Sequence, residues 1–251
     1  MNTIFVHRDG RTERVTSLDR SWLGPPAGAK VVYIWVDLAA PSIPESLVLT
    51  DSFAFHALAV DEARAERHSP RIDAYDDYLF AAVAGPDADV GFFVGSSYIV
   101  SVHRYDSKAV ADQIDSISHG GKQFSEGPFA MFHRLVSAAV AGFEPVVREH
   151  TSCVDGLERR VFEKATPGLV RDIVRARAQV FDLEQRLRRQ QEEVRRLAAR
   201  EIVPVSDEMA FRFRHVRNQL AGLTDRLSGA DRRLGDLAAS ASALAAKKSW
   251  M

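Results

Sequence analysis

Few residues in this chain have the types and spacing that catalysis requires. Gly120-Gly121-Lys122 could belong to a phosphate-binding loop, but it lacks the earlier glycine that such a loop contains. The sequence holds no pair of histidines four residues apart with a glutamate between them, which is the pattern of zinc hydrolases. Cys153 stands in a helical context without an adjacent base, which predicts a buried or inert thiol. We therefore expect that the protein is not an enzyme.

Carboxylates and imidazoles are the remaining candidates for chemistry. Asp61 and Glu62 stand side by side in a predicted helix, and by themselves they are typical of a solvated helix face. His215 occupies a polar helix position, which favours an exposed surface residue. His56 and His103 lie beside apolar segments, so we expect packing histidines with satisfied hydrogen bonds rather than metal ligands.

Composition places these residues in a folded, water-soluble chain. The 251 residues are 46% hydrophobic and 27% charged, which excludes disorder as the main state. A single cysteine cannot form an intramolecular disulfide, and the first residues lack the pattern of a secretion signal. The uncharged stretch from Val90 to Val102 falls short of the ~20 apolar residues that cross a bilayer. A cytosolic location is expected.

Charge is distributed unevenly along the chain. From Thr166 to the end there are 17 Lys and Arg against 11 Asp and Glu, a net charge of +6, so the remainder carries −7. A basic extension can indicate nucleic-acid binding. Here the arginines alternate with acidic residues and have no aromatic residues among them, which favours a solvated helix face. We expect no nucleic-acid partner.

The first half of the sequence predicts a mixed β-sheet with helices. Its central strand is residues 31–38, because these are β-branched or aromatic nearly throughout and suit burial on both faces. Asp9-Gly10 predicts a tight turn between two short strands. The other predicted strands are 4–6, 14–18, 78–84, 91–94 and 98–103, and the predicted helices are 46–49, 53–66 and 110–117.

The second half predicts long helices. A helix opens at Pro128 and runs through Phe143, and heptads from Leu169 predict a long amphipathic helix that ends at Pro204. These features give three segments: a sheet domain at 1–127, connecting and long antiparallel helices at 128–205, and a stalk helix at 206–251.

The last segment has the most regular apolar pattern. Its core positions recur every three or four residues, which specifies a helix of ~40 residues and ~60 Å, more than one compact domain can bury. We expect this helix to project and to pack on sister copies through a seam. The seam comprises Phe213, Val216, Leu220, Leu223, Leu227, Leu234, Leu237 and Leu244.

Several fragments, in order, match a known family. They are Trp35 to Leu38, Phe55 to Glu62, Ser69 to Phe80, Tyr98 to His103, and Phe211 to Val216. With the two long helices that follow, the chain resembles the cytoplasmic region of the CorA family of magnesium and cobalt transporters over nearly its whole length. The resemblance implies an α/β fold: a mixed β-sheet in an α/β/α sandwich, followed by two long α-helices that form a coiled-coil stalk.

The family also implies an assembly at a membrane. Its members form homo-oligomers of five copies whose stalks lead into membrane helices, and a Gly-Met-Asn tripeptide follows the first membrane helix. This sequence contains neither, and its last residues, from Lys247 to Met251, resemble a membrane boundary. The expectation is a soluble piece of a transporter that meets the cytoplasmic face of the cell membrane through a missing C-terminal segment. A homologue that naturally lacks a pore is the alternative.

The resemblance further implies a metal-sensing site between protomers. By position, Asp61 and Glu62 match an acidic pair of that site, and His215 stands on the neighbouring stalk where an aspartate is expected. Mg²⁺ keeps most of its water and needs only one or two carboxylates, whereas imidazole suits Zn²⁺, Co²⁺ or Ni²⁺ better. A second acidic cluster would fall near Ser137 and Ala141, which cannot act as carboxylates.

Three functions follow from these features. The first is a metal-sensing and gating domain of a divalent cation transporter, with Mg²⁺ as the expected ion and Co²⁺ or Zn²⁺ as alternatives. The second is a metal-independent coiled-coil assembly module, which the residues at 137, 141 and 215 favour. The third is a zinc-transporting relative of the same family, which His215 favours.

Overall fold

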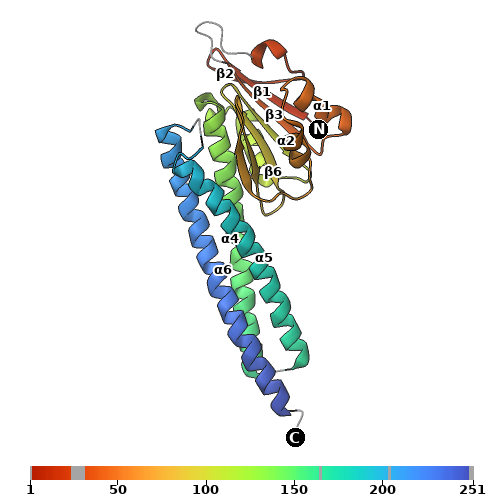
Figure 1. Ribbon diagram of the computed structural model, residues 1–251, viewed down its shortest axis with the longest axis vertical. Helices are drawn as coiled ribbons and strands as arrows, with labels where there is room; N and C mark the ends of the chain where they lie inside the picture. The colour runs from red at the N-terminus through yellow and green to blue at the C-terminus, as the bar shows by residue number, and fades with distance from the viewer. Residues whose placement is uncertain (1, 24–31, 164–165, 203–204, 249–251) are drawn as a thin grey trace.

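The computed structural model describes residues 2–23, 32–163, 166–202 and 205–248 (Figure 1). It consists of a sheet domain from which a rod of long helices extends. The strands are β1 (Asn2–Arg8), β2 (Arg11–Val15), β3 (Tyr33–Ala39), β4 (Arg71–Ala74), β5 (Tyr78–Val83), β6 (Val90–Gly95) and β7 (Tyr98–His103). The helices are η1 (Arg20–Leu23), α1 (Ile43–Asp51), α2 (Ala57–Ala63), α3 (Lys108–Ser118), η2 (Gln123–Glu126), α4 (Pro128–Glu163), α5 (Pro167–Ala198) and α6 (Asp207–Lys248).

The described strands form one seven-stranded mixed sheet in the order β2-β1-β3-β7-β6-β5-β4. β3 and β7 are parallel, with Ala39 opposite His103, and the other neighbouring pairs are antiparallel. Asp9 and Gly10 both have positive φ, as the predicted turn between β1 and β2 requires. The mixed sheet and its central strand are confirmed, although Val31 lies outside the described residues.

Both faces of the sheet are covered, and this explains the unbroken apolar run in β3. Trp35 on one face packs into the core under α3 and α4, whereas Ile34 and Val36 on the other face pack beneath α1 and α2. Figure 1 shows α1 and α2 on the side of the sheet away from α4. The structure is therefore an α/β/α sandwich, as the resemblance implied.

Three long helices follow the sheet, where two were expected. α4 has 36 residues and continues through Pro145 to Glu163, well beyond the predicted end at Phe143. α5 has 32 residues and α6 has 42. Pro204, the predicted boundary between the last two, and residues 249–251 lie outside the described residues.

The seam on α6 is buried within its own chain, so the expectation that it needs sister copies for burial was wrong. α6 packs against both α5 and α4 over the length of the rod (Figure 1). Seam residues from Phe213 to Leu237 are buried there, and only Leu244 among the seam residues is substantially exposed, at 45%. The physical reason is that α4 and α5 are themselves long enough to cover the apolar stripe of α6. No helix in the described ranges combines the length and apolar character needed to cross a membrane.

Candidate functional site

The predicted carboxylates lie on α2, a seven-residue helix on the outer face of the sheet. The helix begins at His56, which is exposed and accepts a hydrogen bond from the Leu58 N–H through its side chain, so it is a helix cap rather than a packing histidine. Ala63 rests on Gly91 of β6, where an added Cβ would lie 2.9 Å from the Ala63 Cβ. This close approach requires glycine and fixes the position of α2 on the sheet.

Asp61 and Glu62 face different neighbours. Asp61 is exposed and lines a cavity together with Arg64, His103 and Arg104. The Glu62 carboxylate lies 3.9 Å from His68 Nδ1 and 3.8 Å from an Arg71 guanidinium nitrogen. Successive residues on a helix are separated by about 100° of rotation, so the two carboxylates point in different directions.

His68 is the buried group next to Glu62. Both of its ring nitrogens are buried and have no hydrogen-bond partner among the described residues. Burial lowers the pKa of His68 below its usual range, although the charges of Asp89 and Glu62 oppose that shift. The imidazole is therefore neutral at physiological pH, and Glu62 has no strong cationic partner in it.

His215 lies far from the predicted carboxylates within one chain. It is exposed on α6, whose neighbours α4 and α5 lie on the side of the sheet opposite α2. Its charge contributes to a lowered pKa at His133, where burial is the larger cause. In the described ranges, no three His, Cys, Asp or Glu residues are grouped closely enough to hold a metal ion.

Glu144 and Arg226 form an ion pair near Ser137 and Ala141, where the family's second acidic cluster would fall. Ala141 is exposed on α4, one turn from Ser137, and Glu144 follows on the same surface. Glu144 accepts two hydrogen bonds of 2.8 Å from one guanidinium nitrogen of Arg226 on α6. Glu144 therefore links α4 to α6.

Sequence reasoning missed a row of polar side chains on α5 that binds the helix to the sheet. We call it the α5 polar stripe, and it comprises Arg186, Gln190, Glu193 and Arg196. At its first position Arg186 forms an ion pair with Asp89, whose side chain is only 3% exposed. Asp89 also accepts hydrogen bonds from the backbone N–H groups of His68 at 2.9 Å and Gly85 at 3.3 Å. This end of the stripe thus holds two loops of the sheet domain.

Gln190 is 2% exposed and satisfies the backbone just beyond β5. Its Oε1 accepts a 2.6 Å hydrogen bond from the Ala84 N–H, and its Nε2 donates at 3.3 Å to the Ala84 carbonyl. A buried backbone amide without partners is costly, so the pairing fixes the position of α5 over the sheet.

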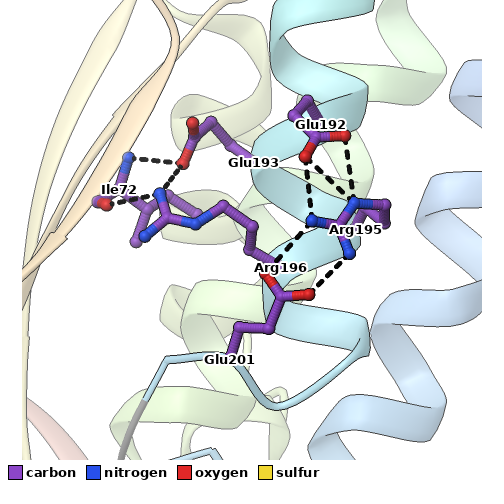
Figure 2. A network of polar contacts seen from close by, with 6 residues as sticks. All are labelled: Ile72, Glu192, Glu193, Arg195, Arg196 and Glu201. Carbon is purple, nitrogen blue, oxygen red and sulfur yellow. Dashed lines mark hydrogen bonds and ion pairs between the residues drawn. The ribbon is translucent and has the colours of Figure 1, made fainter.

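The other end of the stripe occupies the free edge of the sheet (Figure 2). Glu193 accepts a 3.0 Å hydrogen bond from the Ile72 N–H, and Arg196 donates at 3.1 Å to the Ile72 carbonyl and at 2.6 Å to Glu193. Ile72 belongs to β4, an edge strand whose outer backbone groups would otherwise lack partners. The two side chains form hydrogen bonds with the Ile72 backbone that a neighbouring strand would otherwise form.

The same turn of α5 has a second set of ion pairs that faces away from the sheet. Arg195 donates to Glu192 on its own helix and to Glu201 in the connection after it. Figure 2 shows the two sets side by side, with Glu193 and Arg196 toward β4 and Arg195 directed away from it. The outward set stabilises the helix end without contacting the sheet.

A chain of buried polar side chains links β3 and β7 on the face of the sheet that carries Trp35, opposite α2. Trp35 Nε1 donates to Ser101 Oγ at 3.0 Å, and Ser101 Oγ donates to Asp37 at 2.5 Å. His103 is 5% exposed, with Nε2 3.3 Å from Asp37 and Nδ1 2.6 Å from the Tyr105 carbonyl. The prediction that His103 is a packed histidine with satisfied hydrogen bonds is confirmed.

Burial alone would lower the pKa of His103, but the hydrogen bond and charge of Asp37 and the Tyr105 carbonyl outweigh it. The pKa of His103 therefore lies above its usual range. His103 and Asp37 thus form a buried pair toward the ends of β3 and β7.

The fold and its helix contacts define a class of protein, in which an α/β/α sandwich is bound firmly to a rod of three helices. Comparison with families gives the class a name: the model described as "CorA-like Mg2+ transporter protein" matches residues 31–249. The chain belongs to the CorA-like Mg²⁺ transporter family, whose members are transporters rather than enzymes.

One curated protein is similar to part of the chain. The chain is 21% identical over 159 residues to "Putative metal ion transporter YfjQ" of Bacillus subtilis (strain 168), covering 61% of this chain and 50% of the relative. It thus spans about half the length of the curated relative that it matches.

Solved structures share the fold at low sequence identity. The soluble domain of CorA from Methanocaldococcus jannaschii superposes with a TM-score of 0.77 at 13% identity, covering 96% of this chain and 97% of that one. The complete CorA magnesium transporter of that organism gives 0.77 at 14% identity, with 96% and 77% covered. The ZntB cytoplasmic domain from Vibrio parahaemolyticus RIMD 2210633 gives 0.71 at 12% identity, with 96% and 98% covered.

Proposed function

We propose that this chain is the cytoplasmic, metal-sensing and gating domain of a CorA-like divalent metal cation transporter. It works as a homo-oligomer, a pentamer in the full transporter, at the cytoplasmic face of the cell membrane. Mg²⁺ is the sensed ion, with Co²⁺ and Zn²⁺ as the alternatives. The observation that carries the proposal is the α5 polar stripe, which joins the sheet domain to the rod.

The stripe gives the sheet domain a mechanical connection to the rod. Three of its members bind backbone groups of the sheet domain at Ala84 and Ile72, and the fourth binds the buried Asp89. The opposite surface of α5 packs along α6. A displacement of the sheet domain therefore moves α5, and α6 moves with it because their shared core is closely packed.

The positions of the predicted ligands support a ring of copies. Asp61 and Glu62 lie on one side of the sheet domain, and His215 lies on the helices that cover the other side. A metal ion shared between α2 of one copy and α6 of the next would join two different surfaces. Such head-to-tail contacts close into a ring when the rotation between copies permits it.

Charge gives the metal a role in that ring. Residues 1–165 carry a net charge of −7, so neighbouring sheet domains repel one another. A divalent cation between Asp61 or Glu62 and the next copy offsets part of this repulsion. Loss of the ion lets the sheet domains separate, and the stripe passes the displacement to the rod. The size of this population shift depends on how differently the two states bind the metal.

The test is oligomer mass by light scattering, together with the melting temperature, with Mg²⁺ and after removal of metal on a chelating resin. We expect Mg²⁺ at about a hundred times its Kd to raise the mass and to raise the melting temperature by about 5 °C. The double variant Asp61→Asn/Glu62→Gln should lose both effects. The matched control, Asp76→Asn/Glu66→Gln, removes two exposed carboxylates of the same domain and should keep them. Equal masses and melting temperatures in both conditions would refute metal sensing.

A metal-independent assembly module is the second candidate, because the described residues of one chain lack a three-ligand group. Calorimetric titration of Mg²⁺, Co²⁺ and Zn²⁺ separates the possibilities. The assembly module predicts no binding heat with any ion. A zinc-transporting relative predicts heat with Zn²⁺ that His215→Ala abolishes, whereas the magnesium sensor predicts heat with Mg²⁺ that Asp61→Asn/Glu62→Gln abolishes.

A further inference from the structure

A cavity of about 180 Å³ opens where the parallel strands β3 and β7 end side by side. Ala39 and His103 are opposite each other at these ends, and the chain turns away at Ala40, which has a positive φ of 46°. The carboxyl ends of adjacent parallel strands are where open α/β sheets commonly bind ligands. The lining residues are Pro41, Asp61, Ala63, Arg64, Val102, His103 and Arg104.

The cavity lining carries positive charge that forms no ion pairs among the described residues. Arg64, which caps the end of α2, and Arg104, which follows β7, are both exposed. In the part of the chain that the structure describes, neither guanidinium group has an ion-pair or hydrogen-bond partner. His103 is also a lining residue, and its imidazole is bonded to Asp37 and to the Tyr105 carbonyl. Asp61 is the acidic residue in the lining.

We propose that this cavity binds a small oxyanion of the phosphate or carboxylate type between the guanidinium groups of Arg64 and Arg104. A guanidinium group offers paired N–H donors that match such oxygens, and two arginines line this cavity. The volume decides the size of the ligand. It corresponds to about six water molecules at ~30 Å³ each and lies below the ~300 Å³ at which cofactor pockets begin. It therefore suits an inorganic anion or a short dicarboxylate rather than a nucleotide.

Asp61 gives the proposal a test that separates it from metal sensing. Its carboxylate repels an anion in the cavity, so Asp61→Asn should strengthen oxyanion binding. The same substitution should weaken the binding of a divalent cation. The two functions thus predict opposite effects of one variant, and either can fail without the other.

The experiment is calorimetric titration of the metal-free chain with inorganic phosphate and, in a second arm, with succinate. Metal is removed on a chelating resin, because soluble chelators are themselves polycarboxylates. We expect saturable binding in at least one arm, and the tighter ligand identifies phosphate or carboxylate chemistry. The double variant Arg64→Gln/Arg104→Gln should bind that ligand at least about tenfold more weakly, a change of about 1.4 kcal/mol.

The matched control is Arg67→Gln, which removes an exposed arginine close in sequence to Arg64 but outside the cavity lining. It should bind the anion within about twofold of the unaltered chain. Circular dichroism melting checks that each variant is folded. Absence of saturable binding in both arms, equal loss in Arg67→Gln, or weaker binding in Asp61→Asn would each overturn the proposal.

Discussion

His103 and Asp37 form a buried pair in which the charge of one residue depends on pH. The ordinary pKa of histidine is 6.5, and the pKa of His103 in the folded chain lies above it because Asp37 and the Tyr105 carbonyl outweigh the effect of burial. Asp106 also contributes to the rise.

A pH-dependent stability follows from this pair. Because the pKa is raised on folding, the stabilisation is fully present below pH 6.5 and is lost as the pH rises through the folded pKa. Asp37→Asn should lower the free energy of unfolding by about 3 kcal/mol at pH 6 and by less above the folded pKa of His103. Urea denaturation of the unaltered chain and of the variant, at several pH values across this range, measures this loss. A loss that is the same at every pH would contradict the prediction, because it would show that the imidazole does not change its charge in this range.

Individual residues also show how far the sequence could predict the site. The sequence placed Asp61 and Glu62 on a helix, but their different neighbours depend on how the loop with His68 and Arg71 folds back on α2. The burial of Gln190 could not be predicted from the sequence, because a helix rich in arginine and glutamate has polar residues on every face. Only the docking of α5 on the sheet shows that this polar residue points inward.

The long helices show what an apolar period can and cannot predict. The apolar pattern on α6 predicts the length of the helix and its buried stripe. It does not predict which surface covers that stripe. Val147, Val154, Leu157 and Val161 continue the stripe of α4 at spacings of seven, three and four, and all are buried. Polar residues such as Arg148 and His150 interrupt this stretch and hid the continuation. β4 was missed because it is four residues long and depends on β5 and α5 for its partners.

Burial of α6 inside its own chain makes a prediction about the seam. Leu227 is fully buried, so Leu227→Ala should lower the free energy of unfolding by about 2–5 kcal/mol. Leu244→Ala should cost less than about 1 kcal/mol, because its side chain is 45% exposed. Urea denaturation at two protein concentrations provides the measurement. A large Leu227 effect that grows on dilution would mean that sister copies, rather than α4 and α5, bury the seam.

On the scale of the whole molecule, the structure has an acidic sheet domain joined to a basic rod by one polar stripe. Residues from Thr166 onward carry a net charge of +6 and the rest −7, so each part of one copy attracts the opposite part of another. This charge split can be read directly from the amino-acid sequence. It could not give the stripe, because the contacts of α5 with Ala84 and Ile72 join residues more than a hundred positions apart.

Hydrogen exchange measured by mass spectrometry, with and without Mg²⁺, tests most directly whether the stripe carries a metal signal to the rod. In the unaltered chain, Mg²⁺ should slow exchange in α2 and also in α6. Glu193→Ala/Arg196→Ala, which releases β4, should confine the slowing to α2. The control Glu192→Ala/Arg195→Ala removes the outward ion pairs of the same helix turn and should leave slowing in both helices. Slowing confined to α2 in the unaltered chain, or unchanged slowing in α6 after the stripe is broken, would contradict the account.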